Sequence, residues 1–116
     1  MTQALIFKIF TRQQWLQTEA DGTFVGAPID LADGYVHLST AEQVAETAAK
    51  FFTGMDDLVL AAVDPTSYGE KLVYEVSRGG ALFPHLYDRL TLASVRWVQP
   101  LPLGADGRHT FPNLRQ

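Results

Sequence analysis

The chain has 116 residues, a formal net charge of −4 and no cysteine; 47% of its residues are hydrophobic and 19% are charged. This balance is typical of a globular chain, and the length predicts a single small domain over residues 1–116. The lack of cysteine excludes disulfides, thiol nucleophiles, iron–sulfur clusters and cysteine-ligated zinc. The nine Lys and Arg residues are scattered, which argues against non-specific nucleic-acid binding.

The sequence carries no sign of a targeting or membrane segment. The apolar residues 4–7 are too few for the core of a secretion signal, and no run reaches the roughly 20 apolar residues of a membrane span. We therefore expect a cytoplasmic protein that does not bind membranes.

The first third of the chain predicts one strand, one helix and a loop. Residues 4–10 are apolar, β-branched or aromatic with one lysine, which favours a strand. Thr11 and Gln14 then match a capping box and predict a helix over residues 12–20. Residues 23–33 contain glycine, proline and two aspartates, and this composition predicts an irregular loop.

The middle of the chain predicts a strand, a helix and a central strand. Residues 34–38 suit a half-buried strand, and Ser39 or Thr40 can cap a following helix, which ends at Gly54. Apolar residues recur along this segment at helical spacing. The continuous apolar run at residues 57–63 then predicts a central strand.

The last part of the chain predicts further strands at residues 71–76, 95–98 and 108–111, with a long loop over residues 77–89. Two main helices and several late strands favour an α+β fold with a mixed β-sheet over a doubly wound parallel sheet.

The strongest local motif is His37-Leu38-Ser39-Thr40 at the predicted strand-to-helix junction. A helix N-terminus carries free N–H groups and partial positive charge, which favours a phosphate or carboxylate ligand. The hydroxyls of Ser39 and Thr40 would add donors beside His37. The alternative is that both hydroxyls are ordinary caps and that His37 is a half-buried strand residue.

The predicted loop after the strand at residues 71–76 is a second candidate. It begins with Arg78 and two glycines and contains Phe83, His85 and Tyr87, which is unusually apolar for a loop. These side chains either line a pocket or close one end of the sheet.

Single charged residues in two strands are a third candidate. Glu75 is either solvated or directed into a cleft with His37 and His85, and Lys8 has the same two interpretations. The three histidines lack the helical spacing of a metal site, and the chain has no P-loop, dinucleotide fingerprint or serine-hydrolase motif. We expect no metal, and His109 is expected at the surface.

Residues 33–40 (DGYVHLST) and 83–87 (FPHLY) resemble the DUF952 family, whose pattern is D-G-[aromatic]-[aliphatic]-H-x-S-T followed by F-P-H-[aliphatic]-Y. Glu75 matches a common glutamate of the family, and the resemblance covers nearly the whole chain. The family is named for its lack of an established function, so the resemblance implies a fold and site residues more firmly than an activity.

DUF952 proteins are grouped by distant similarity with the ADP-ribosyltransferase superfamily. The resemblance implies a split sheet with NAD in the cleft between its halves, with His37, Ser39 and Thr40 near the nicotinamide ribose and Glu75 stabilising the transition state. Many relatives carry histidine in the first strand where this chain has Lys8, which could hold a phosphate but cannot shuttle protons near pH 7.

Three functions remain open. The first is an ADP-ribosyltransferase-like enzyme that uses NAD or a related nucleotide in a cleft. Its candidate catalytic residues are His37, Glu75 and His85, and its candidate ligand-binding residues are Lys8, Ser39, Thr40, Arg78 and Tyr87. The second is a non-catalytic module that binds a small anion, nucleotide or peptide there. The third is a structural domain, which predicts buried histidines and no cleft.

Overall fold

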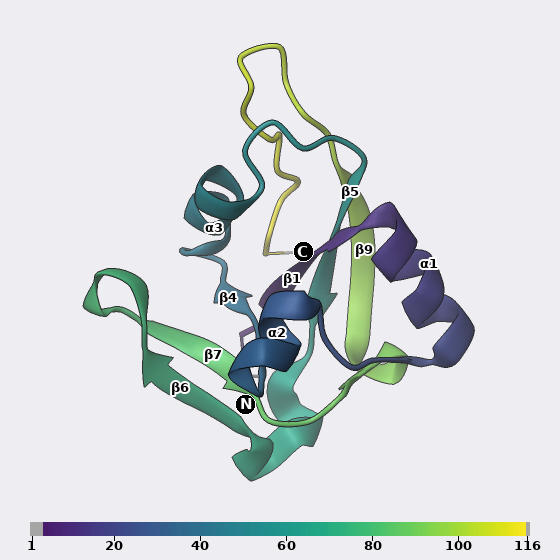
Figure 1. The fold of residues 1–116 in the computed structure, drawn as a ribbon, viewed down its shortest axis with the longest axis vertical. Helices are drawn as coiled ribbons and strands as arrows, with labels where there is room; N and C mark the ends of the chain where they lie inside the picture. Colours follow the sequence, from purple (N-terminus) through teal and green to yellow (C-terminus); the bar gives the residue numbers. More distant parts are fainter. Residues whose placement is uncertain (1–3, 116) are drawn as a thin grey trace.

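The computed structural model describes residues 4–115, except for the side chain of Arg78. Figure 1 shows α1 and α3 on either side of β1, with α2 crossing in front. The described helices and strands are, in chain order, β1 (Ile6–Thr11), α1 (Arg12–Asp21), β2 (Thr23–Phe24), α2 (Pro28–Asp33), β3 (Val36–His37), β4 (Ser39–Thr40), α3 (Val44–Phe51), β5 (Leu58–Val63), β6 (Leu72–Val76), β7 (Leu82–Leu86), β8 (Leu90–Thr91) and β9 (Val95–Leu101). Short 3₁₀ helices cover Pro65–Lys71, Arg78–Gly80 and Leu92–Ser94.

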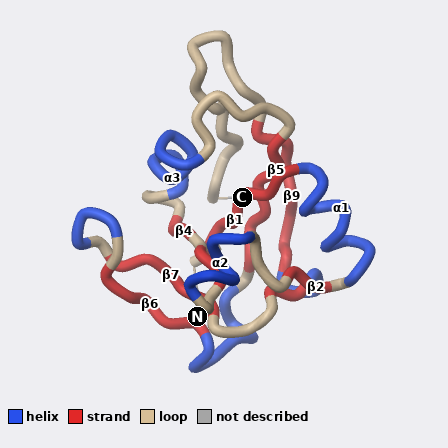
Figure 2. The backbone as a smooth tube through the Cα atoms, in the orientation of Figure 1, coloured by secondary structure: helices blue, strands red, loops and turns tan. Residues whose placement is uncertain are grey.

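The strands divide among separate sheets, coloured red in Figure 2. The largest has the order β4-β1-β5-β9, the second has the order β3-β7-β6, and β2 pairs with β8. Within residues 4–115 each of these pairings is antiparallel, so the predicted mixed sheet is wrong while the α+β class is confirmed. The apolar run at residues 57–63 forms the central strand β5, which is buried along its whole length.

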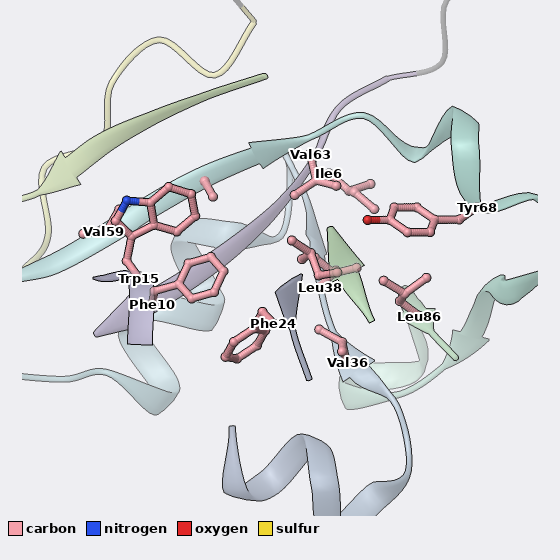
Figure 3. Close-up of a cluster of buried hydrophobic side chains, with 12 residues drawn as sticks. Ile6, Phe10, Trp15, Phe24, Val36, Leu38, Val59, Val63, Tyr68 and Leu86 are labelled. Atoms are coloured by element: carbon pink, nitrogen blue, oxygen red, sulfur yellow. The ribbon is translucent and has the colours of Figure 1, made fainter. Parts of the chain in front are cut away.

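Two apolar clusters hold the layers together. The first joins α1 to both large sheets, and Figure 3 shows Phe10 between Trp15 and Phe24, with ring centroids 5.3 and 4.8 Å away. The second includes Phe7 and Val44 and packs α3 on the opposite face of β1. Because strand side chains alternate, β1 buries both of its faces.

The helix after β3 begins later than the sequence predicts. Ser39 and Thr40 form β4, where they pair with Phe7 and Ile6 of β1, and α3 starts only at Val44. Thr40 also bonds locally to Gln43: its N–H donates to Gln43 Oε1 at 3.1 Å and its carbonyl accepts from the Gln43 N–H at 3.0 Å. The N-cap of α3 is nevertheless Gln43, so neither Ser39 nor Thr40 caps the helix. The predicted anion site at a helix N-terminus formed by Ser39 and Thr40 is therefore wrong.

Other local predictions change for equally specific reasons. The predicted loop at residues 77–89 contains β7, which pairs on both sides even though Pro84 lacks an N–H; its carbonyl accepts from the Leu38 N–H at 3.1 Å. The predicted loop at residues 23–33 contains β2 and an α-helix that the sequence did not predict, α2. The predicted strand at residues 108–111 is reduced to one bridge between Leu103 and His109.

The capping box at the start of α1 is confirmed. Thr11 Oγ1 accepts from the Gln14 N–H at 3.1 Å, and Gln14 Oε1 accepts from the Thr11 N–H at 3.0 Å. No helix within residues 4–115 has the length and apolar character needed to cross a membrane.

Candidate functional site

A cavity of about 530 Å³ lies where the two large sheets meet. Strand β1 contributes Phe7 and Ile9, β3 contributes His37, and β7 contributes Phe83 and His85, while α2 and the end of α3 form the rim. Its volume lies within the range of small-molecule sites. The hypothesis that the chain is a structural domain predicts that no cleft is present, and this cavity contradicts that prediction.

Asp30 of α2 anchors one histidine of this cavity. Its Oδ1 lies 2.6 Å from Nδ1 of His37 and accepts from the His37 N–H at 3.0 Å, while Oδ2 accepts from the Ala27 N–H at 2.7 Å. Lys8 Nζ donates to both carboxylate oxygens at 3.1 and 3.3 Å and to the His37 carbonyl at 2.9 Å. The buried Asp30 thus fixes the backbone and ring of His37 together.

Burial and charge act against each other in this cluster. Burial raises the pKa of Asp30, but the hydrogen bond from His37 and the charge of Lys8 outweigh it and lower the pKa to about 2. Burial also lowers the pKa of Lys8, an effect that Asp30 opposes. The carboxylate is therefore ionised at any pH near neutrality.

Acid should remove the stability that Asp30 supplies. Its folded pKa of about 2 lies below its ordinary value of 3.8, so its contribution is present above about pH 4 and is lost as the pH falls towards 2. We expect the free energy of unfolding of the unmodified protein to fall by about 2 kcal/mol more between pH 5 and pH 2 than that of Asp30→Asn. Urea unfolding at each pH measures this difference, and parallel pH profiles would contradict it.

The second histidine has its own carboxylate. His85 Nδ1 lies 2.8 Å from Glu75 Oε1, and the Tyr87 hydroxyl donates to the same oxygen at 2.7 Å. His85 is 4% exposed, and its Nε2 has no hydrogen-bond partner among the described residues. Within residues 4–115, Trp97 Nε1 is the only side-chain polar atom that is both buried and without a partner, so His85 Nε2 is not fully buried, and His85 lines the cavity.

The Tyr87 hydroxyl reports directly on the charge of Glu75. Its hydrogen bond to Glu75 raises the pKa of Tyr87 to about 12, because the phenolate would face a carboxylate. In Glu75→Gln we expect this pKa to fall towards 10, measured by ¹³C NMR titration of the tyrosine Cζ signals. Tyr68, in the hydroxyl cluster with Ser94, serves as an internal control. An unchanged Tyr87 pKa would contradict the assigned contact.

Tyr35 packs against both histidines. Its ring stacks on His85 with a centroid distance of 4.0 Å and an interplanar angle of 17°, and its centroid lies 4.6 Å from that of His37. The two imidazole centroids are 5.7 Å apart. His37 Nε2 also lies 2.9 Å from Oδ2 of Asp33, at the end of α2. The result is one aromatic group with a carboxylate held against each imidazole.

Comparison with protein families matches residues 9–98 to the family described as "Protein of unknown function (DUF952)". The chain belongs to this family. Two solved structures of the protein CC0527 from Caulobacter crescentus are similar to it. The crystal structure shares 50% identity, with 92% of this chain and 94% of that chain covered and a TM-score of 0.89. The solution structure shares 51% identity, with 90% of each chain covered and a TM-score of 0.81. A search of curated proteins finds no match.

This DUF952 domain brings only some of its predicted site residues together. His37, His85 and Ser39 line the cavity, and the Ser39 hydroxyl is bonded to that of Thr47 at 2.9 Å. Glu75 reaches the cavity only through His85. Thr40 and Tyr87 do not line it. The side chain of Arg78 lies outside the described residues.

Lys8 lines the cavity but does not offer a free charge. Its three hydrogen bonds go to Asp30 and to the His37 carbonyl, so the predicted phosphate contact would require breaking a buried ion pair. By bonding to Asp30 of α2 and to the His37 carbonyl of β3, Lys8 holds the end of β3 and α2 together. Among the described residues, no group of three or more metal-ligating side chains is arranged to bind a metal.

Sequence reasoning missed Asp30, Asp33 and Tyr35. The signal for Asp30 was a proline followed two residues later by an acid, which is typical of a helix start. Taking residues 23–33 as irregular concealed the helix and the direction of its carboxylates. Asp33 and Tyr35 were recognised as members of the family motif at residues 33–40, and Tyr35 also as a strand former, but neither was assigned to the site.

Proposed function

We propose that the cavity binds a small molecule through a flat, hydrogen-bonding ring, and that His85 acts on it as a general base. The observation that carries this proposal is the free Nε2 of His85, whose Nδ1 is held by Glu75. A carboxylate only accepts hydrogen bonds, so Nδ1 carries the hydrogen and Nε2 keeps its lone pair in the neutral ring. An oriented imidazole of this kind is a common general base.

His37 is the complementary donor. Both of its ring nitrogens face carboxylates, those of Asp30 and Asp33, at 2.6 and 2.9 Å. Both contacts are hydrogen bonds only when each nitrogen carries a hydrogen. A ligand ring that shares the Nε2 hydrogen of His37 with Asp33 therefore meets a donor at His37 and an acceptor at His85, an arrangement suited to an amide or to a nucleobase edge.

ADP-ribosyl transfer from NAD is the second candidate. A cavity lined from two sheets is in keeping with the cleft that the resemblance implies, and a nicotinamide carboxamide suits the donor and acceptor of the two histidines. Two contacts speak against the full reaction: Lys8 is bound to Asp30, and Glu75 is bound to His85 and Tyr87 instead of lining the cavity. A non-catalytic binding module would use the same ring contacts without turnover.

NMR titration with nicotinamide, nicotinamide mononucleotide and NAD tests the proposal. We expect the imidazole signals of His85 and His37 to shift with each of them, and the response to be lost in His85→Gln, which retains most of the side-chain volume. Tyr74→Phe, on the exposed strand β6, is the control that should bind normally. Unshifted imidazole signals at millimolar concentrations of all three compounds would overturn the proposal, and release of nicotinamide from NAD would favour the second candidate.

A further inference from the structure

The cavity lining has a polar part and an apolar part. The polar part holds the buried His85 and the half-buried Tyr35 and His37, which pack against it, whereas the apolar part includes side chains of α2 and of the segment after α3. Ile29 and Met55 line the cavity and yet remain 55% and 39% exposed. Apolar side chains exposed at the mouth of a cavity gain from covering by an apolar part of a ligand.

The Met55 side of this rim is held in place by hydrogen bonds. The Met55 N–H donates to the Phe52 carbonyl at 3.0 Å, and Nε2 of His109 donates to the Met55 carbonyl at 2.7 Å. His109 lies in the segment after β9, so the end of the chain supports the wall of the cavity. Phe52 lines the cavity beside Met55 and also packs on the second apolar cluster.

The charges of the cavity compensate each other. Lys8 is bound to Asp30, and Asp33 is bound to His37, so the described lining side chains present no unpaired charge. An ionised group entering this mostly apolar space would lose hydration without gaining a counter-charge. The pattern favours an uncharged ligand over a phosphate or carboxylate.

We infer that the ligand is an uncharged amphipathic molecule: a carboxamide-bearing ring at the histidines with an apolar substituent that extends along Ile29, Phe52 and Met55. This inference rests on the proposed ring binding and names the class of ligand. Compared with a nucleotide, the inferred ligand carries an alkyl or aryl group in place of the phosphate chain.

A matched series of compounds tests the inference on the full chain. Benzamide, 4-ethylbenzamide and 4-butylbenzamide differ only in their apolar substituent, and 4-butylbenzoate replaces the amide by a negatively charged carboxylate. Nicotinamide mononucleotide carries a ribose phosphate on a positively charged ring. The His85 imidazole signals report on the ring, and the Met55 methyl signal reports on the substituent. We expect affinity for the amides to rise about two- to fourfold per methylene, and the benzoate to bind at least tenfold more weakly than the matching amide.

Surface variants locate the substituent. Ile29→Ser and Met55→Ser should flatten the dependence on chain length while leaving benzamide binding unchanged. Leu16→Ser on α1 is the matched control, because Leu16 is 54% exposed and lies outside the cavity. It should keep the full dependence.

The outcomes separate the inference from the proposed function. Shifted His85 signals with no dependence on chain length, or tighter binding of the mononucleotide than of 4-butylbenzamide, would overturn the inference and leave ring binding intact. Failure of every compound to shift the His85 signals would overturn both.

Discussion

The Asp30→Asn variant should lose about 3–5 kcal/mol of its free energy of unfolding, the largest effect expected of any single polar substitution near the cavity. The buried carboxylate holds Lys8, which is itself buried, and accepts from two backbone N–H groups and the His37 ring. The amide removes the charge that compensates Lys8. Urea unfolding followed by tryptophan fluorescence and circular dichroism measures the loss.

Asp33→Asn is the matched control for this prediction. Asp33 contacts the same imidazole, but its side chain is 44% exposed, and within residues 4–115 this imidazole is its one hydrogen-bond partner. We expect a loss below 1 kcal/mol. Adding Lys8→Met to Asp30→Asn should restore part of the lost stability, because it removes the uncompensated buried charge. Equal losses in the two asparagine variants would show that the buried ion pair is not what sets the effect.

Replacing His85 with alanine should slow any reaction at the site and weaken binding in the cavity. We expect at least a tenfold loss of affinity for nicotinamide-type rings and, for any turnover that the site supports, a fall in kcat of about 10²- to 10⁴-fold, because the general base is removed. Isothermal titration and product formation measure the two effects. Glu75→Gln should lower kcat less than His85→Ala does, because it keeps the base and alters only the orientation of His85 and the charge at its Nδ1. It should also change the pH profile of the reaction.

The folding of each His85 variant needs its own readout. His85 is buried and pairs with His37 across β3 and β7, so a denatured alanine variant would lose binding trivially. His85→Gln and the ¹⁵N spectrum of each variant distinguish the two cases. A folded His85→Gln protein that binds and turns over normally would remove His85 from the proposed mechanism.

The sequence correctly predicted those helices and strands whose characteristic residue patterns lie inside the element itself. The Thr11–Gln14 capping box placed α1, and the uninterrupted apolar run at residues 57–63 placed β5, because a strand buried on both faces needs no polar alternation. The start of α3 was predicted too early. Ser39 and Thr40 are good caps in isolation, but β1 offers their backbone a sheet ladder. That choice depends on a strand more than 30 residues away in the chain.

In the candidate site, too, local motifs identified residues, whereas contacts between distant elements were harder to predict. The motifs that contain His37 and His85 identified the two histidines, and the structure brings their rings to 5.7 Å. Lys8 and Glu75 were singled out as unusual; His85 was among the neighbours that one of the two interpretations gave Glu75, whereas the Asp30 partner of Lys8 was not predicted. Each partner comes from another element: Asp30 from α2 for Lys8, and His85 from β7 for Glu75.

Residues close together in the chain are enough to predict the composition class of this protein, its α+β character, its central strand and the two histidine motifs. Which of its charged side chains are paired depends instead on how distant elements pack. Lys8 is a charged residue in an apolar strand until α2 brings Asp30 against it, and Glu75 is an exposed acid until β7 presents His85. Hydrogen bonds and ion pairs act over about 3 Å, so the chemistry of these residues depends on contacts made only when distant elements pack together.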